Sequence, residues 1–294
     1  MTAPMPAGHV VNHDGNHYAG QRIALLTQHG KEEIIAPVLD AALGCRVERV
    51  AGFDTDTLGT FSRDIPRAGS QLEAARRKAR IGMELSGLAQ GLASEGAFGA
   101  DPIAGLLPWN VELLVFIDAA RGIEVTGMAQ QATRFAHLLT DDWVQAAQFA
   151  RQAGFPEHHL VVRPHSENDA RIVKGLATWP ALETAFRRAC EQAENGQAFL
   201  EHDARAHAHP SRRDVIRIAA ADLAAKLRSL CPACGTPGFC VVERLGGLPC
   251  ADCGAPTREV RADVYGCQKC GHRASQACCD RESADPGRCD YCNP

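Results

Sequence analysis

Residues 231–294 read CPACGTPGFCVVERLGGLPCADCGAPTREVRADVYGCQKCGHRASQACCDRESADPGRCDYCNP. This segment contains four Cys-x-x-Cys pairs, which are Cys231/Cys234, Cys250/Cys253, Cys267/Cys270 and Cys289/Cys292. Each pair can place two thiolates on one side of a tight turn, and a tetrahedral Zn²⁺ ion needs two such pairs. The eight cysteines therefore predict two structural zinc sites, because four sulfur ligands leave no open position for catalysis.

The residues next to these pairs bear on how they are grouped. Gly235, Gly254 and Gly271 directly follow three of the pairs, where a Cβ would obstruct a sharp turn of the backbone. The pairs that begin at Cys231 and Cys250 share the pattern Cys-x-x-Cys-Gly-x-Pro, which favours sequential pairs sharing one ion. Nested and interleaved groupings are also allowed. The remaining cysteines of the segment are not expected to be ligands: Cys240, Cys278 and Cys279.

The cysteine pattern also allows two other roles. A disulfide framework needs an oxidising compartment, but the chain opens without a signal-peptide pattern, so reduced cysteines and a cytoplasmic location are expected. An iron–sulfur cluster is the second alternative, since sets of four cysteines also bind iron. The segment is too short and polar to hold a core by itself, so bound metal is expected to supply its folding energy.

Composition sets the domain organisation. Eleven of the thirteen cysteines follow residue 230, so we predict a disordered tail over 1–19, an α/β domain over 20–230 and a zinc-ribbon domain over 231–294. No run of eighteen apolar residues occurs, so neither a membrane span nor a membrane partner is expected. The net charge of −4, and an excess of acidic over basic residues in the tail, make nucleic acid an unlikely partner. The oligomeric state is not indicated.

The start of the α/β domain suggests an anion site. Residues 22–27 form a buried-strand pattern, a helical pattern follows Lys31, and residues 45–50 alternate as a second strand. The intervening loop then lies at a strand's carboxyl end, where α/β folds bind ligands. Lys31 opposes the helix dipole, and a bound anion would remove that conflict, although a solvated lysine is the alternative.

The rest of this domain is predicted to be a mixed sheet with helices. Ser70 and Glu73 form a capping box for a helix that ends near Gly87. Residues 111–118 and 123–125 should form a hairpin, and residues 160–164 another strand. Helical patterns cover 128–153, with a break near Thr140, and also 169–174, 180–194 and 215–230. Between residues 199 and 217, clustered histidines and arginines suggest either an anion site or a solvated linker.

The order of motifs over residues 22–126 resembles the inosine/xanthosine triphosphatases, which are mixed α/β nucleotide pyrophosphatases. The motifs are Thr27-x-His29-x-Lys31, an acidic loop, a basic helix, Ser94-Glu95-Gly96 and a strand ending in Asp118; the family has Thr-Asn-x-x-Lys where this chain has Thr-Gln-His-Gly-Lys. The resemblance implies a phosphate contact for Lys31, a metal or general-base role for Glu95, and an additional acid at Asp64. Mg²⁺ would be the cofactor.

The whole chain also resembles an uncharacterised bacterial family with such a domain and a cysteine-rich tail ending in Cys-Asn-Pro, through Ser94-Glu95-Gly96-x-Phe98-Gly99 and Asp203-x-Arg205-Ala206-His207. We therefore hold two hypotheses. In the first, the protein is a Mg²⁺-dependent hydrolase, or a binder, of a nucleotide or other phosphate compound, with Arg67, Arg205 and His207 as further substrate contacts. This enzyme hypothesis requires Lys31, Glu95 and Arg205 to converge in one pocket. In the second, a non-enzymatic adaptor uses its zinc ribbons to contact a protein.

Overall fold

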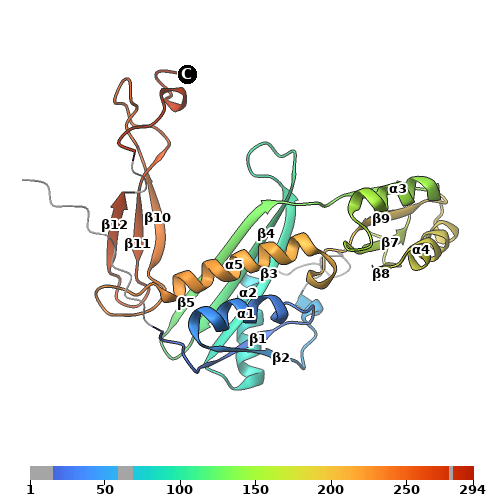
Figure 1. Ribbon diagram of the computed structural model, residues 1–294, viewed down its shortest axis with the longest axis horizontal. Coiled ribbons are helices and arrows are strands. Elements are labelled where there is room, and N and C mark those ends of the chain that lie inside the picture. Colours follow the sequence, from blue (N-terminus) through green and yellow to red (C-terminus); the bar gives the residue numbers. More distant parts are fainter. Residues whose placement is uncertain (1–15, 59–68, 278–280) are drawn as a thin grey trace, which may run out of the picture.

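The computed structural model of the protein describes residues 16–58, 69–277 and 281–294 (Figure 1). These residues form three β-sheets that follow one another along an elongated molecule. A five-stranded sheet lies in the middle, a four-stranded sheet lies at one end, and the cysteine-rich tail stands at the other end. The fold is therefore mixed α/β, and the stretch 20–230 contains two sheets with separate cores.

The central sheet is mixed, as the sequence predicted. Its strand order is β2-β1-β3-β4-β5, in which β1 runs parallel to β2 and β3 while β3, β4 and β5 are antiparallel. The strands are β1 (Arg22–Leu26), β2 (Arg46–Val50), β3 (Gln90–Ala100), β4 (Pro108–Asp118) and β5 (Ile123–Ala132). The expected strand–helix–strand unit at its start is confirmed by β1, α1 (Glu32–Leu43) and β2.

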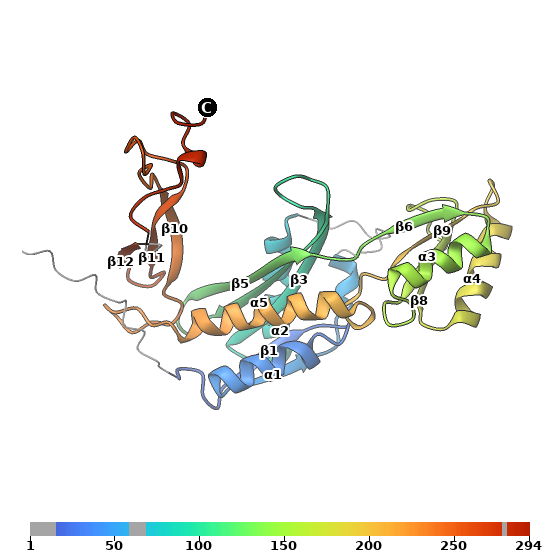
Figure 2. The same ribbon diagram turned by 45° about the horizontal axis from the view of Figure 1, so that its top comes forward.

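Alternation along β1 explains how helices cover both faces of this sheet. Ile23 and Leu25 point into a core shared with α1 and α5 (Pro210–Arg228), whereas Ala24 and Leu26 point to the face that α2 (Gln71–Ser86) covers. The capping box of α2 is present: Ser70 Oγ accepts from Glu73 N at 3.2 Å, and Glu73 Oε2 accepts from Ser70 N at 2.7 Å. Helix α5 lies across the sheet and connects all three parts (Figure 2).

The second sheet has the order β6-β9-β7-β8, and all its pairs are antiparallel. It consists of β6 (His137–Thr140), β7 (Leu160–Pro164), β8 (Val173–Leu176) and β9 (Ala198–His202), packed against α3 (Trp143–Ala153) and α4 (Trp179–Gln192).

Two sequence predictions of helix are wrong. Residues 128–132 and 137–140 are strands rather than helix, and Val173–Leu176 is an edge strand in the region predicted as helix 169–174. Pairing of β5 with β4, of β6 with β9 and of β8 with β7 outweighs the weak helical periodicity of these segments.

The tail forms a three-stranded antiparallel sheet of the order β10-β11-β12. Its strands are β10 (Cys240–Gly246), β11 (Val260–Gly266) and β12 (Arg273–Ala277). Three short 3-10 turns complete the described elements: η1 (Thr55–Leu58), η2 (Ala206–Ala208) and η3 (Pro286–Arg288). Among the described helices, none combines the length and the apolar character that a membrane crossing requires.

Candidate metal centres and a buried charge cluster

The eight predicted cysteines gather into two sets of four. One set is Cys231, Cys234, Cys267 and Cys270, the other is Cys250, Cys253, Cys289 and Cys292, and the sulfur atoms within each set lie within 4.8 Å of one another. We call each Cys-x-x-Cys pair with its turn a knuckle. Between the two knuckles of one set, the closest Sγ–Sγ distances are 3.6 to 3.8 Å. A tetrahedral ion with Zn–S bonds of about 2.3 Å places its sulfur ligands about 3.8 Å apart. The two sets therefore suit two structural zinc ions.

The same sulfur–sulfur distances argue against the two other roles of the cysteines, a disulfide framework and an iron–sulfur cluster. A disulfide bond is only about 2.0 Å long, and all the cysteines that the structure describes are free. A multi-iron cluster would spread its four thiolates over several metal atoms and needs wider separations than these. A single tetrahedral ion fits each set. With four sulfur ligands, neither set keeps an open position for a catalytic water molecule.

The local turn of each knuckle follows from its sequence. In each pair the first cysteine is buried and the second is exposed. The carbonyl of the first cysteine accepts a hydrogen bond from the fourth residue after it, as in Gly235 N to Cys231 O at 2.8 Å. Gly235, Gly254 and Gly271 all have φ near +72°, a conformation that favours glycine. The fourth knuckle makes the same bond from Asn293 N to Cys289 O at 2.9 Å.

The knuckles alternate along the chain, so the expectation of sequential pairs is wrong. The first knuckle shares a set with the third, and the second shares a set with the fourth. The reason lies in the antiparallel sheet, because β10 carries the chain away from the first knuckle and β11 brings it back. The second knuckle is left at the far end of this hairpin, where only the segment after β12 can reach it. Sequence spacing does not contain this information.

The first set lies beside the α/β part, because two residues of the third knuckle bond to the β4–β5 hairpin. The second set includes Cys292, which is close in sequence to the C-terminus that Figure 2 marks at the far end of the tail. Gln268, inside the third knuckle, exchanges two hydrogen bonds with the backbone of Glu124, at 2.6 and 2.9 Å. Lys269 Nζ donates to Arg121 O at 3.0 Å. Glu124 lies in β5, and Arg121 lies in the turn between β4 and β5. These contacts attach the third knuckle, which belongs to the first cysteine set, to the central sheet.

Lys31 is buried at the carboxyl end of β1. Its side chain is 7% exposed, and Nζ donates to Ser94 O at 2.7 Å and to Ser94 Oγ at 3.3 Å. Burial lowers the pKa of Lys31 to about 7, and the positive charges of Arg212 and Lys78 act in the same direction. The carboxylates of Glu112 and Glu95 oppose this shift. Lys31 therefore changes its charge near neutral pH.

Four charged groups of the described residues act on Lys31 and form with it what we call the charge cluster: Lys78, Glu95, Glu112 and Arg212. Glu95 forms an ion pair with Lys78. Glu112 pairs with Arg212, whose Nε lies 2.6 Å from Glu112 Oε1, and both side chains are almost wholly buried. Gly96 has to be a glycine, since a Cβ would lie 2.3 Å from Glu112 Oε1.

The other predicted site residues are only partly brought together. His207 lies beside the Lys31 loop, with its ring centroid 5.8 Å from that of His29. Arg205 instead pairs with Asp203 and lines a small cavity together with Lys174 and Glu201. Lys31 and Glu95 thus share one cluster, whereas Arg205 lines a small cavity to which neither Lys31 nor Glu95 contributes. Asp64 and Arg67 lie outside the described residues, as do Cys278 and Cys279.

Three members of the charge cluster were not singled out as site residues: Lys78, Glu112 and Arg212. Glu112 interrupts an otherwise apolar strand, and a charged residue at a core position needs a partner. That signal could have identified Glu112, but the partner Arg212 is a hundred residues away, so only the fold reveals the pair.

Three histidines meet where the second sheet joins the central one: His158, His202 and His209. Their ring centroids lie 4.9 to 5.8 Å apart. His209 Nδ1 accepts from Arg212 N at 3.2 Å, so Nε2 must donate to Arg134 O at 2.9 Å. His202 is held in the same way, between Ala136 N and Ala153 O. Both rings are therefore held in the neutral form.

We expect acid to weaken this junction. Burial lowers the pKa of all three histidines, that of His209 to about 3, and neighbouring arginines act in the same direction. Since the unfolded value is 6.5, the stabilisation is complete above pH 6.5 and is lost as pH falls toward 3. His209 alone should cost ~2 kcal/mol at pH 5 relative to pH 7.

Urea unfolding from pH 7.5 to 4.5 measures this effect. His209→Gln should flatten the profile, whereas His137→Gln, at an exposed position, should leave it unchanged. Equal slopes for the wild type and for His209→Gln would contradict the assignment.

Comparison with known proteins gives a family but no activity. A search of curated proteins finds no match. The family described as "Domain of unknown function (DUF6671)" matches residues 78–294, from inside α2 to the end of the tail. This range includes Glu95, the Glu112–Arg212 pair and all eight predicted metal ligands. Nothing in these comparisons supports the resemblance to nucleotide pyrophosphatases. The match covers most of the chain, and the protein therefore belongs to the DUF6671 family.

Proposed function

We propose that the α/β part of this protein binds a small phosphate compound, with a nucleotide as the first candidate, next to Lys31. In this proposal the two zinc ions are structural and hold the tail on the central sheet. The observation that carries the proposal is the charge cluster, in which, among the described residues, three cations lie beside two carboxylates. Lys31, Lys78 and Arg212 carry the positive charges, and Glu95 and Glu112 carry the negative ones.

A bound anion would balance the excess positive charge of the described groups in this cluster. A buried lysine whose pKa is lowered to about 7 is partly neutral at physiological pH. A phosphate group beside it would favour the charged form and would gain a charge-assisted hydrogen bond. The position of Lys31 also suits an anion, because Lys31 is the N-cap residue of α1 and its side chain makes no capping hydrogen bond to the first turn of that helix. His29 and His207 lie at the same loop.

The contacts support a binder more than a Mg²⁺-dependent hydrolase. The resemblance implied that Glu95 holds the metal or acts as a general base, but Lys78 is already paired with this carboxylate. Glu112 is held by Arg212 in the same way. A magnesium ion would have to compete with these cations for its oxygen ligands. Arg205 lines a cavity to which neither Lys31 nor Glu95 contributes, so the convergence that the enzyme hypothesis required is incomplete.

Titration calorimetry against nucleoside mono-, di- and triphosphates and inorganic phosphate tests the binder. Lys31→Met should weaken binding about 10- to 100-fold, as expected for the loss of a charge-assisted hydrogen bond. Arg77→Met is the matched control, because Arg77 is exposed on α2. Glu95→Gln should retain binding, and added Mg²⁺ should not produce pyrophosphate or phosphate. If no compound in the panel binds to the zinc-loaded protein, or if Lys31→Met binds as the wild type does, the proposal fails.

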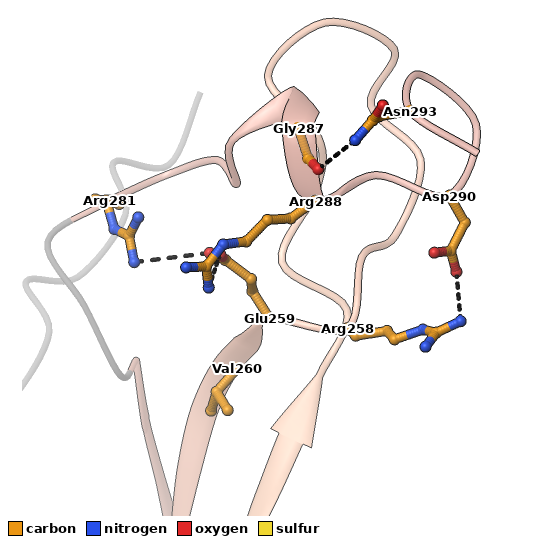
Figure 3. Close-up of a pocket in the computed structure, with 8 residues that line it drawn as sticks. All are labelled: Arg258, Glu259, Val260, Arg281, Gly287, Arg288, Asp290 and Asn293. Atoms are coloured by element: carbon orange, nitrogen blue, oxygen red, sulfur yellow. Dashed lines mark hydrogen bonds and ion pairs between the residues drawn. The ribbon is translucent and has the colours of Figure 1, made fainter. Parts of the chain in front are cut away.

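A second candidate function is that of an adaptor, and one observation favours it. Near the second cysteine set the tail contains an open cavity of about 630 Å³ (Figure 3). Arg281 and Arg288 approach Glu259 at its wall, and Arg258 pairs with Asp290. The guanidinium groups are mostly exposed, so they could exchange these partners for the carboxylates of an acidic peptide. This would make the free end of the tail the contact surface for a protein.

A further inference from the structure

The hairpin between β3 and β4 ends in an apolar loop that projects from the central sheet (Figure 1). We call residues 101–107, with the sequence Asp-Pro-Ile-Ala-Gly-Leu-Leu, the hairpin tip. Ile103 is 94% exposed, Leu106 81% and Leu107 56%. Single exposed aliphatic residues are ordinary, but three on one short loop form a surface that calls for an explanation.

The backbone N–H groups of the hairpin tip are bonded within the tip itself. The carboxylate of Asp101 accepts from the N–H groups of four residues at 2.6 to 3.1 Å: Ile103, Ala104, Leu106 and Leu107. Gly105 N donates to Asp101 O at 3.1 Å, and Pro102 has no N–H. In this described loop every N–H from 102 to 107 is therefore absent or bonded within the loop. The tip can move from water into an apolar environment without leaving an N–H donor unbonded.

We propose that the hairpin tip inserts into the surface of a lipid bilayer, as a peripheral contact. Removing a backbone N–H from water without a partner costs several kcal/mol in a bilayer, and this loop avoids that cost. Its three aliphatic side chains match hydrocarbon. The four N–H bonds hold the pKa of Asp101 below its usual range, so this residue stays ionised and should remain at the level of the headgroups. Trp109, at the base of the loop, stands where interfacial tryptophans are found.

A protein partner fits the hairpin tip less well. A stable protein interface takes about 800 Å² and 20–30 residues from each side, far more than three side chains on a projecting loop. Such interfaces also form about one hydrogen bond per 100–200 Å², but this tip has no N–H left to offer. Contact between the hairpin tips of two copies would also bury too little area for a stable interface. A bilayer closes around a small apolar protrusion and requires no donors from it.

The proposal departs from the sequence expectation of no membrane partner, which considered spanning segments. It concerns a peripheral contact and agrees with the lack of a spanning helix among the described residues. The hairpin tip contains no basic residue. Its partition should therefore depend little on anionic lipid or on salt, in contrast to proteins that use polybasic patches.

Co-sedimentation of the zinc-loaded, full-length protein with vesicles tests the inference. Phosphatidylcholine vesicles, with and without phosphatidylglycerol, should bind the wild type equally well. Ile103→Asp with Leu106→Asp should lower the partition at least about tenfold, because aspartate is strongly disfavoured in hydrocarbon. The matched control is Val144→Asp with Ile218→Asp, which changes two exposed aliphatic residues on α3 and α5 and should bind as the wild type does.

A further variant separates the backbone effect from apolar area. Asp101→Ala keeps all three aliphatic side chains but frees the N–H groups, so it should also lower the partition. Circular dichroism and zinc content confirm that each variant is folded. The proposal is overturned if the wild type stays in the supernatant with both vesicles, or if the control loses as much partition as the tip variant. It is equally overturned if the wild type is an oligomer that the tip variant dissociates without any vesicle binding.

Discussion

Removal of the bound metal should unfold residues 231–294, with the largest effect that we expect of any single change. The buried apolar cluster of the tail consists of Cys231, Phe239 and Cys267, with Tyr265 and Ala274 partly buried beside it. So small a core cannot offset the entropy of ordering the segment. Structural zinc contributes about 10–16 kcal/mol per site in model peptides, which is enough to decide whether the tail folds.

Elemental analysis should return two zinc ions per chain and no stoichiometric iron. A strong chelator should make the tail sensitive to limited proteolysis, whereas the central sheet should stay protected. Far fewer than two zinc ions, or a tail that is indifferent to chelation, would contradict the assignment of both metal sites.

Paired substitutions distinguish the interleaved grouping from a sequential one. Cys231→Ser with Cys267→Ser removes two ligands from one set, so one zinc ion should remain. Cys231→Ser with Cys250→Ser damages both sets, so both ions should be lost or weakly held. Sequential grouping predicts the reverse result for the two variants. The metal content of purified protein therefore reports the topology directly.

Breaking the Glu112–Arg212 pair should have the second-largest effect. Arg212 Nε and Nη2 contact the two carboxylate oxygens of Glu112 at 2.6 and 3.3 Å, and Nη1 donates to Ala204 O at 2.6 Å. These bonds connect β4 of the central sheet to α5 and to the segment that leads from the second sheet. Arg212→Met would leave a buried carboxylate without its cation, which typically costs about 3–5 kcal/mol.

Urea denaturation measures this loss, with Arg217→Met as the control. Arg217 also pairs with an acid on α5, but both side chains are more than half exposed, so its removal should cost less than about 1 kcal/mol. The double variant Arg212→Met with Glu112→Met should be more stable than Arg212→Met alone, because it leaves no unpaired charge. A loss below about 1 kcal/mol in Arg212→Met would show that the pair is not needed.

The sequence was most informative where structure depends on neighbouring residues. The capping box at Ser70 and Glu73, and the glycines at φ near +72° in three knuckles, follow from residues within a few positions. It was least informative where pairing between strands decides whether a segment is helix or strand. Residues 128–132 have a weak helical pattern but form part of β5, because β4 pairs with them. Helix α5 also packs closely against this strand at Gly127, where an added Cβ would lie 2.5 Å from Ala219 O.

The sequence by itself determined that eight cysteines form four knuckles able to hold two metal ions, and that Lys31 stands at the end of a strand. These properties are local, since tight turns and alternating strands are encoded by adjacent residues. Only the tertiary structure decided which knuckles share an ion, and that Lys78, Glu112 and Arg212 surround Lys31. Both depend on where antiparallel strands and α5 bring distant segments, and spacing along the chain does not specify such long-range packing.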